Sequence, residues 1–202
     1  METKIILRDD DVSANTNKTA LLEMYAIFRR RFSDTEFWYA TSPLSKKITE
    51  TFAPNSVYPD PPFKHRERSF FYDVDNLGSI VTNLDGQVAV YFSGRYLKLD
   101  NSKVVSHGLL HMDHSQLDRD AQEMSIITSC RLLDTDTFVP PFNKFNGTTK
   151  EICDDHGIQL IEYEGGWKSL EFNDFNPDHK LWYYHSWRWT PETFKEKIDG
   201  RS

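Results

Sequence analysis

Three consecutive aspartates, Asp9–Asp11, are the first residues of this chain whose type and spacing are suited to chemistry. They end a short apolar run, Lys4–Asp9, that is predicted to form a β-strand. Neighbouring carboxylates repel each other, and burying them is costly unless something compensates their charge. The triplet therefore indicates either a solvated loop or helix cap, or a site that binds a cation.

Another predicted strand, residues 103–108, ends in the first of a group of histidines, His107, His111 and His114. His107 and His111 are four residues apart, so both side chains could lie on one helical turn and bind a metal together. Pairs at this spacing also arise by chance, and the pair alone decides nothing. His114 is either a third ligand or a surface residue at the start of a helix.

One further histidine, His185, ends another predicted strand among tryptophans and tyrosines. Taken alone, it reads as part of the core or of a pocket wall. Taken with the other residues, it completes a set of catalytic groups. One carboxylate and two imidazoles form the open three-ligand site typical of Zn²⁺. A neighbouring aspartate can then act as general base, and a histidine from another strand as general acid.

The elements that must position these residues alternate between strands and helices. Such alternation predicts a parallel sheet, open or closed into a barrel. Chemistry in these folds lies at the carboxyl ends of the strands, where the residues above are found. The predicted strands are 4–9, 36–43, 103–108, 136–143, 158–163 and 180–187, and the predicted helices are 17–32, 44–52, 116–133, 148–156 and 190–198.

The 202 residues fit one domain, 1–202, with an irregular excursion around 53–102 that holds a proline-rich stretch and a strand-like run at 86–94. A net charge of −7 argues against nucleic acid as a partner. No apolar run is long enough for a membrane-spanning helix. Two cysteines make no disulfide framework, and the first residues do not read as a signal peptide. We therefore expect a cytoplasmic protein.

The order of motifs resembles the polysaccharide deacetylase family, carbohydrate esterase family 4. "RDDD", "HGLLH", "VPPFN" and "YYH" stand in the family's order between residues 8 and 185. The resemblance implies an α/β fold, a distorted and incomplete (β/α) barrel with about seven strands. The variants of the first and third motifs look closer to a divergent branch of the family than to secreted chitin or peptidoglycan deacetylases.

The resemblance also implies a role for each matched residue. The general base falls on Asp10 and the general acid on His185. The ligands of a divalent metal, expected to be zinc, fall on Asp11, His107 and His111.

Two positions depart from the family pattern. Val139 stands where the family has an arginine that orients the base, and Arg8 is a possible substitute. The family's Asp-Trp motif, which supports the acid histidine, has no clear match near residues 159–167.

These residues imply a metal-dependent deacetylase, an amide hydrolase that acts on an N-acylated sugar. The expected substrate is a cytoplasmic sugar nucleotide or a glycan under assembly for the bacterial surface, such as an O-antigen or capsule precursor. Trp182, Tyr184, Trp187 and Trp189 are aromatic residues that could stack on a sugar. The expected substrate-binding residues are Pro141, Phe142, Asn143 and Trp187.

Two other functions remain open from the sequence. The missing arginine and Asp-Trp motif are compatible with a catalytically altered, metal-containing carbohydrate-binding protein of the same fold. The pair His111 and Asp113, with a distal histidine, could instead form the two-histidine, one-carboxylate site of a non-haem iron oxygenase. That reading leaves Asp10, Asp11 and His107 without a role.

Overall fold

The computed structural model describes residues 4–12, 16–43 and 101–200. The predicted helix 44–52, the strand-like run 86–94 and nearly all of the excursion around 53–102 lie outside the described residues.

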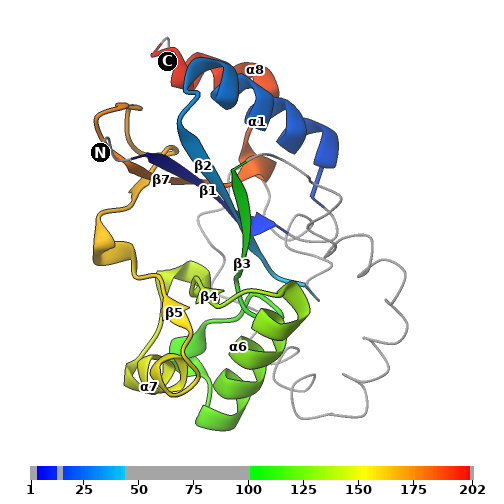
Figure 1. Cartoon of the computed structure of the whole chain (residues 1–202), viewed down its shortest axis with the longest axis vertical. Helices are drawn as coiled ribbons and strands as arrows, with labels where there is room; N and C mark the ends of the chain where they lie inside the picture. The colour runs from blue at the N-terminus through cyan, green and yellow to red at the C-terminus, as the bar shows by residue number, and fades with distance from the viewer. Residues whose placement is uncertain (1–3, 13–15, 44–100, 201–202) are drawn as a thin grey trace.

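A curled sheet of seven parallel strands forms the framework, in the order β5-β4-β3-β2-β1-β7-β6. The parallel sheet confirms what the alternation of strands and helices predicted, and its incomplete barrel confirms the fold that the family resemblance implied (Figure 1). The strands are β1 Ile5–Val12, β2 Thr35–Thr41, β3 Ser102–Ser106, β4 Thr137–Phe138, β5 Gln159–Leu160, β6 Lys168–Ser169 and β7 Leu181–Tyr184.

Helices cover the outer face of this sheet. Helices α1 (Lys18–Arg31) and α8 (Pro191–Ile198) lie side by side over the β1, β2 and β7 half of the sheet, at the top of Figure 1. Helices α6 (Arg119–Leu133) and α7 (Gly147–Asp155) pack together beside β3, β4 and β5. Short 3-10 turns follow several strands, at His114–Gln116, Pro141–Asn143, Tyr163–Gly165 and Ser186–Arg188.

Strand β1 lies between β2 and β7, and its side chains are needed on both faces of the sheet. Leu7 packs outward with Phe28 of α1 and Phe37 of β2 in an apolar cluster beneath the helices. Ile6 packs on the opposite face, inside the barrel. Because successive side chains of a strand face opposite sides, this alternation also sends Arg8 to the inner face.

Helix boundaries follow local capping chemistry, and most were predicted to within one residue. The exception is the start of α6, predicted at 116, which lies at Arg119 behind the N-cap Asp118. Asn17 accepts the backbone N–H of Ala20 at the start of α1, and Thr190 begins α8 through a capping box with Thr193. Gly157, with a φ of +64°, follows the end of α7 in the left-handed conformation expected of a helix C-terminus.

Strand lengths were predicted less well, because pairing rather than apolar content sets them. β4 and β5 pair over two residues each, shorter than predicted, and the chain leaves β4 at two prolines that cannot continue a ladder. β1 continues three residues beyond its predicted end, so all three aspartates lie within the strand. The two-residue β6 was not predicted.

Among the described helices, none combines the length and the apolar character needed to cross a bilayer.

Candidate metal and catalytic site

A β-bulge in β1 explains how two adjacent aspartates face the same pocket. Asp9 pairs with Tyr39 of β2, but the next pair joins Val12 to Thr41, so β1 holds one extra residue between them. Asp11 takes up the irregularity with a φ of 64°. In a regular strand Asp10 and Asp11 would face opposite sides of the sheet, whereas here both line one pocket.

The two histidines reach this pocket from a loop, not from a helical turn as the spacing suggested. The loop follows β3, and His111 has a φ of 45°, which no right-handed helix contains. The nitrogen and oxygen atoms offered by Asp11, His107 and His111 lie within 4.8 Å of one another, and all three residues are buried. His111 Nε2 is 2.7 Å and His107 Nε2 is 3.3 Å from Asp11 Oδ1.

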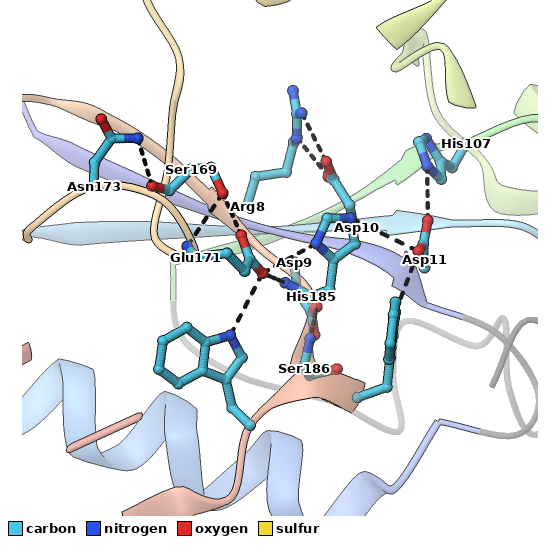
Figure 2. A network of polar contacts seen from close by, with 12 residues as sticks. Arg8, Asp9, Asp10, Asp11, His107, Ser169, Glu171, Asn173, His185 and Ser186 are labelled. Atoms are coloured by element: carbon cyan, nitrogen blue, oxygen red, sulfur yellow. Dashed lines mark hydrogen bonds and ion pairs between the residues drawn. The ribbon is translucent and has the colours of Figure 1, made fainter. Parts of the chain in front are cut away.

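A hydrogen bond and burial hold His107 in the neutral form that a metal ion requires of an imidazole ligand. His107 Nδ1 donates to the carbonyl of Val139 at 2.8 Å, which leaves Nε2 as the atom facing Asp11 (Figure 2). Burial lowers the pKa of His107 and keeps its ring neutral. Burial would by itself raise the pKa of Asp11, but the charges of His111 and His185 hold it well below its ordinary value. A carboxylate with two imidazoles in a buried cluster fits a divalent metal such as zinc.

Asp10 is anchored by Arg8, two residues earlier on the same face of β1. Arg8 Nε lies 2.6 Å from Asp10 Oδ1, and Nη2 lies 2.8 Å from Oδ2, so the pair is bidentate (Figure 2). Both side chains are buried, and the guanidinium carbon lies 4.3 Å from the ring centre of Trp167. The structure therefore places Arg8 where it fixes the orientation of the Asp10 carboxylate.

We expect the substitution Arg8→Met to destabilise the protein by about 3 to 5 kcal/mol, because it leaves a buried carboxylate without its partner. Arg8→Lys keeps a charge but lacks the planar fork that makes both bonds. Urea unfolding at neutral pH measures the loss. Arg119→Met is the control, since Arg119 is half exposed where it meets Glu151 and Asp155, and should cost about 1 kcal/mol or less. Equal losses in the two Met variants would contradict a structural role for the buried pair.

His185 faces the same pocket from the end of β7, and Glu171 holds it from behind. Glu171 Oε1 accepts the ring Nδ1–H of His185 at 3.0 Å and its backbone N–H at 2.8 Å. Nε2 then points toward Asp11 Oδ2, 3.7 Å away (Figure 2). Burial would lower the pKa of His185, but the charges of Asp11 and Glu171 raise it to about 9.

Glu171 was not predicted, because support for His185 was expected near residues 159–167, where the family has its Asp-Trp motif. Glu171 follows the unpredicted strand β6, and its other carboxylate oxygen bonds the Ser169 hydroxyl. Burial opposes ionisation, yet the hydrogen bond and charge of His185 lower the pKa of Glu171 to about 2. An acid two residues after a short polar pair was the available signal, and it is a weak one.

The pocket walls contain some of the expected substrate-binding residues. Phe142 and Asn143 line it, together with Tyr183, which was not predicted. Pro141 is buried at the start of the 3-10 turn that contains Phe142 and Asn143, and Trp187 Nε1 donates to Asp11 Oδ2 at 3.2 Å. The other walls are Asp10, Asp11, His107, His111 and His185.

Two of the aromatic residues expected to stack on a sugar are elsewhere. Trp182 and Tyr184 belong to the apolar cluster beneath α1 and α8, on the outer face of the sheet. Tyr183, between them, faces inward because the strand alternates. Stacking by Trp182 or Tyr184 is therefore excluded. Trp189 packs against the same cluster with Nε1 toward Glu171, and Trp187 reaches the pocket residue Asp11 through its Nε1.

Comparison with solved structures places this arrangement in a known fold. A pseudoenzyme of the CE4 family from Bacillus anthracis matches with a TM-score of 0.57 and 12% identity, over 99% of this chain and 61% of that one. A family 4 carbohydrate esterase from Streptomyces lividans, solved with acetate, matches with a TM-score of 0.53 and 11% identity, over 99% of this chain and 88% of that one. This chain has the fold of the family 4 carbohydrate esterases.

Further matches show that this fold alone does not establish activity. A peptidoglycan deacetylase from Bacillus subtilis aligns with a TM-score of 0.56 and 12% identity, over 98% of this chain and 83% of that one. A mutant of the pseudoenzyme is described as having restored enzymatic activity. No family model and no curated protein matches the sequence. The fold thus accommodates active and inactive proteins, and activity has to be argued from the site.

Within the esterase fold, Asp9 and His114 do not lie where the sequence suggested. Asp9 does not face water as a solvated triplet would: it is 1% exposed, and its Oδ1 accepts the backbone N–H of Ser186 at 2.8 Å. Burial raises the pKa of Asp9 well above its ordinary value. His114 is fully buried rather than on the surface, and both of its ring nitrogens are bonded to protein atoms.

Proposed function

We propose that this protein is a metal-dependent deacetylase that hydrolyses the amide of an N-acylated sugar. The observation that carries the proposal is the content of one pocket. A three-residue donor set for a divalent metal lies beside an arginine-anchored carboxylate and a glutamate-anchored histidine. These are the groups that amide hydrolysis needs: a site for the metal, a base and an acid.

Asp11, His107 and His111 would hold the metal ion, with zinc as the expected occupant. When bound, the ion supplies polarisation of the amide carbonyl and of the attacking water. The other steps belong to the chain's own residues. Asp10 takes a proton from the attacking water while the water oxygen bonds to the carbonyl carbon of the amide. His185 then gives a proton to the nitrogen as the carbon–nitrogen bond breaks, which releases a carboxylate and a sugar amine.

The supports of these two groups suit their roles. Arg8 occupies both oxygens of Asp10 from one side and prevents the carboxylate from rotating away from the pocket. Glu171 accepts from Nδ1 of His185, so the atom available to a leaving amine is Nε2, which faces the metal ligands. Base and acid therefore approach one reacting centre from different strands, β1 and β7.

The proposed substrate class is supported by solved proteins that share this fold. The Streptomyces protein is a carbohydrate esterase, and the Bacillus subtilis protein is a peptidoglycan deacetylase. We propose an N-acylated sugar of a surface polysaccharide, such as an O-antigen or capsule unit or its sugar nucleotide, and a cytoplasmic reaction. Phe142, Asn143 and Trp187 are positioned to contact the sugar around the acyl group, whereas Pro141 supports the turn that carries two of them.

A carbohydrate-binding protein without catalysis is the second candidate. One matching structure is a pseudoenzyme, and Val139 stands where the family has the arginine that orients the base. A non-haem iron oxygenase is not supported, because its expected carboxylate ligand, Asp113, does not join the histidines. The carboxylate of Asp113 accepts from Ser115 and pairs with Lys144. The carboxylate beside His107 and His111 is Asp11.

Metal removal provides the test of the proposed function. The zinc-loaded protein should release acetate or formate from some member of a panel of N-acyl sugars and sugar nucleotides. Dialysis against a chelator should abolish the release, and returning zinc should restore it. Enzymatic detection of the free acid measures the reaction. Tight binding of a glycan with no acid released, across the panel and across divalent metals, would favour the binding protein instead.

A further inference from the structure

The loop that carries both proposed histidine ligands, residues 107–113, has a conformation that needs outside support. His111 lies in the left-handed region, with a φ of 45°, and such backbone persists in non-glycine residues only where the surroundings fix it. The start of the loop is fixed by its neighbours. The His107 N–H donates to the Thr41 carbonyl at 2.9 Å, and its carbonyl accepts the Ser42 hydroxyl at 2.7 Å.

A chain of hydrogen bonds supports the segment around His111. The Leu109 N–H donates to Ser125 Oγ at 3.1 Å, and Ser125 Oγ lies 3.0 Å from His114 Nε2. His114 Nδ1 lies 2.8 Å from the Met112 carbonyl. A carbonyl can only accept, so Nδ1 carries the ring proton and Nε2 accepts from the serine hydroxyl. The chain thus joins the backbone two residues before His111 to the backbone one residue after it.

Both members of this chain are buried where water cannot replace them. Ser125 of α6 and His114 have no exposed surface, and the His114 ring packs against Phe138 with 5.0 Å between centroids. Burial lowers the pKa of His114 to about 4, which agrees with the neutral ring that the hydrogen bonds require. With both nitrogens engaged, His114 has no atom left for a metal.

Gly108 provides the space that the His114 ring fills. Its φ is +75°, and a Cβ built on it would lie 2.8 Å from His114 Cε1. Because the ring is held at both nitrogens, it cannot move aside cheaply. Glycine at 108 and histidine at 114 are therefore linked by shape as well as by their place on the loop.

We propose that Ser125 and His114 are positioning residues that hold the loop 107–113 in the shape in which His111 reaches the metal. The inference rests on the metal site of the proposed function, but it concerns residues that touch neither metal nor substrate. Outer-shell partners of metal ligands typically contribute 10- to 100-fold in affinity. The loss of either residue should therefore appear in metal binding itself.

Zinc affinity, measured by competition with a chromogenic chelator, tests the proposal without any substrate. Ser125→Ala and His114→Gln should each weaken zinc binding by about 10- to 100-fold. Thr149→Ala is the control for a lost buried hydroxyl, since Thr149 is fully buried and its hydroxyl bonds Gln122 and Asn146, which lie outside the loop 107–113. His156→Gln is the histidine control, because His156 is exposed where it meets Glu123. Both controls should bind zinc as the wild type does.

A second measurement uses the metal-free protein, so it reports on the loop without depending on zinc binding. Hydrogen exchange at the Leu109 amide should be faster in Ser125→Ala than in the wild type or in Thr149→Ala, because the serine oxygen that accepts the Leu109 N–H is gone. Gly108→Ala should also weaken zinc binding, and by less in a His114→Ala background, where the ring no longer opposes the added methyl group.

The outcomes separate this inference from the proposed function. If the wild type binds no zinc or other divalent metal, the proposed function fails. If the wild type binds zinc and Ser125→Ala and His114→Gln bind it equally well, with Leu109 exchange unchanged, the proposed function stands and the inference is overturned.

Discussion

The substitution Asp10→Asn is expected to lower kcat by about 10²- to 10⁴-fold, the range that a general base contributes. Asparagine has nearly the same shape as aspartate but cannot take a proton from water. Metal binding should persist, since the three donor residues are Asp11, His107 and His111. Steady-state kinetics on a released acid, together with the zinc content of the purified variant, measures both quantities.

The neighbouring aspartate offers a matched control. Asp9→Asn changes an adjacent buried carboxylate of the same strand, and its amide oxygen can still accept the Ser186 N–H. We expect kcat of Asp9→Asn to stay near that of the wild type. Because the asparagine NH₂ cannot accept a hydrogen bond, Asp10→Asn also removes one of the two bonds from Arg8, so its unfolding free energy must be measured beside its activity. Unchanged kcat in Asp10→Asn, or equal losses in both variants, would remove Asp10 as the base.

The substitution His107→Ala is expected to weaken zinc binding by more than about 100-fold, the upper limit typical of losing an outer-shell partner. It removes one of three ligands, and the two that remain cannot enclose the ion. Activity should fall with it, and adding excess zinc should restore little. Calorimetry or chelator competition with zinc alone gives the affinity.

His156→Ala serves as the control for a lost imidazole. His156 lies at the end of α7, exposed, with Nε2 3.1 Å from a carboxylate oxygen of Glu123. The His156→Ala variant should bind zinc as tightly as the wild type does. If His107→Ala also retained full affinity, the ion would have to lie elsewhere, which would contradict the proposed metal site.

The fold class was predictable because local chemistry carries it. Alternating apolar strands and amphipathic helices encode a parallel sheet, and side chains such as Asn17 and Thr190 mark the helix starts directly. The placement of polar residues after strands then pointed to the pocket edge. For this reason the triplet Asp9–Asp11, His107, His111 and His185 could be proposed from the sequence, and the family resemblance selected Asp10 and Asp11 within the triplet. The pocket contains Asp10, Asp11 and all three histidines.

Residues whose partners are distant in the sequence were not predictable. Glu171 lies 14 positions from His185 and beside a strand too short to show a pattern. The support for His111 comes from Ser125 on a helix, and nothing in that helix marks this serine among the others. Their roles depend on distances between elements, which follow from packing of the whole sheet.

The sequence by itself determined which chemical groups this protein has and in what order they follow the strands. It determined the helix ends and the parallel sheet as well, since both depend on neighbours within a few residues. Tertiary structure decided which groups act together. The bulge in β1 turned Asp10 and Asp11 to one side, and the buried pairs gave Arg8 and Glu171 their partners. The physical reason is that a buried charge is tolerated only beside its partner, and the fold sets that partner's position.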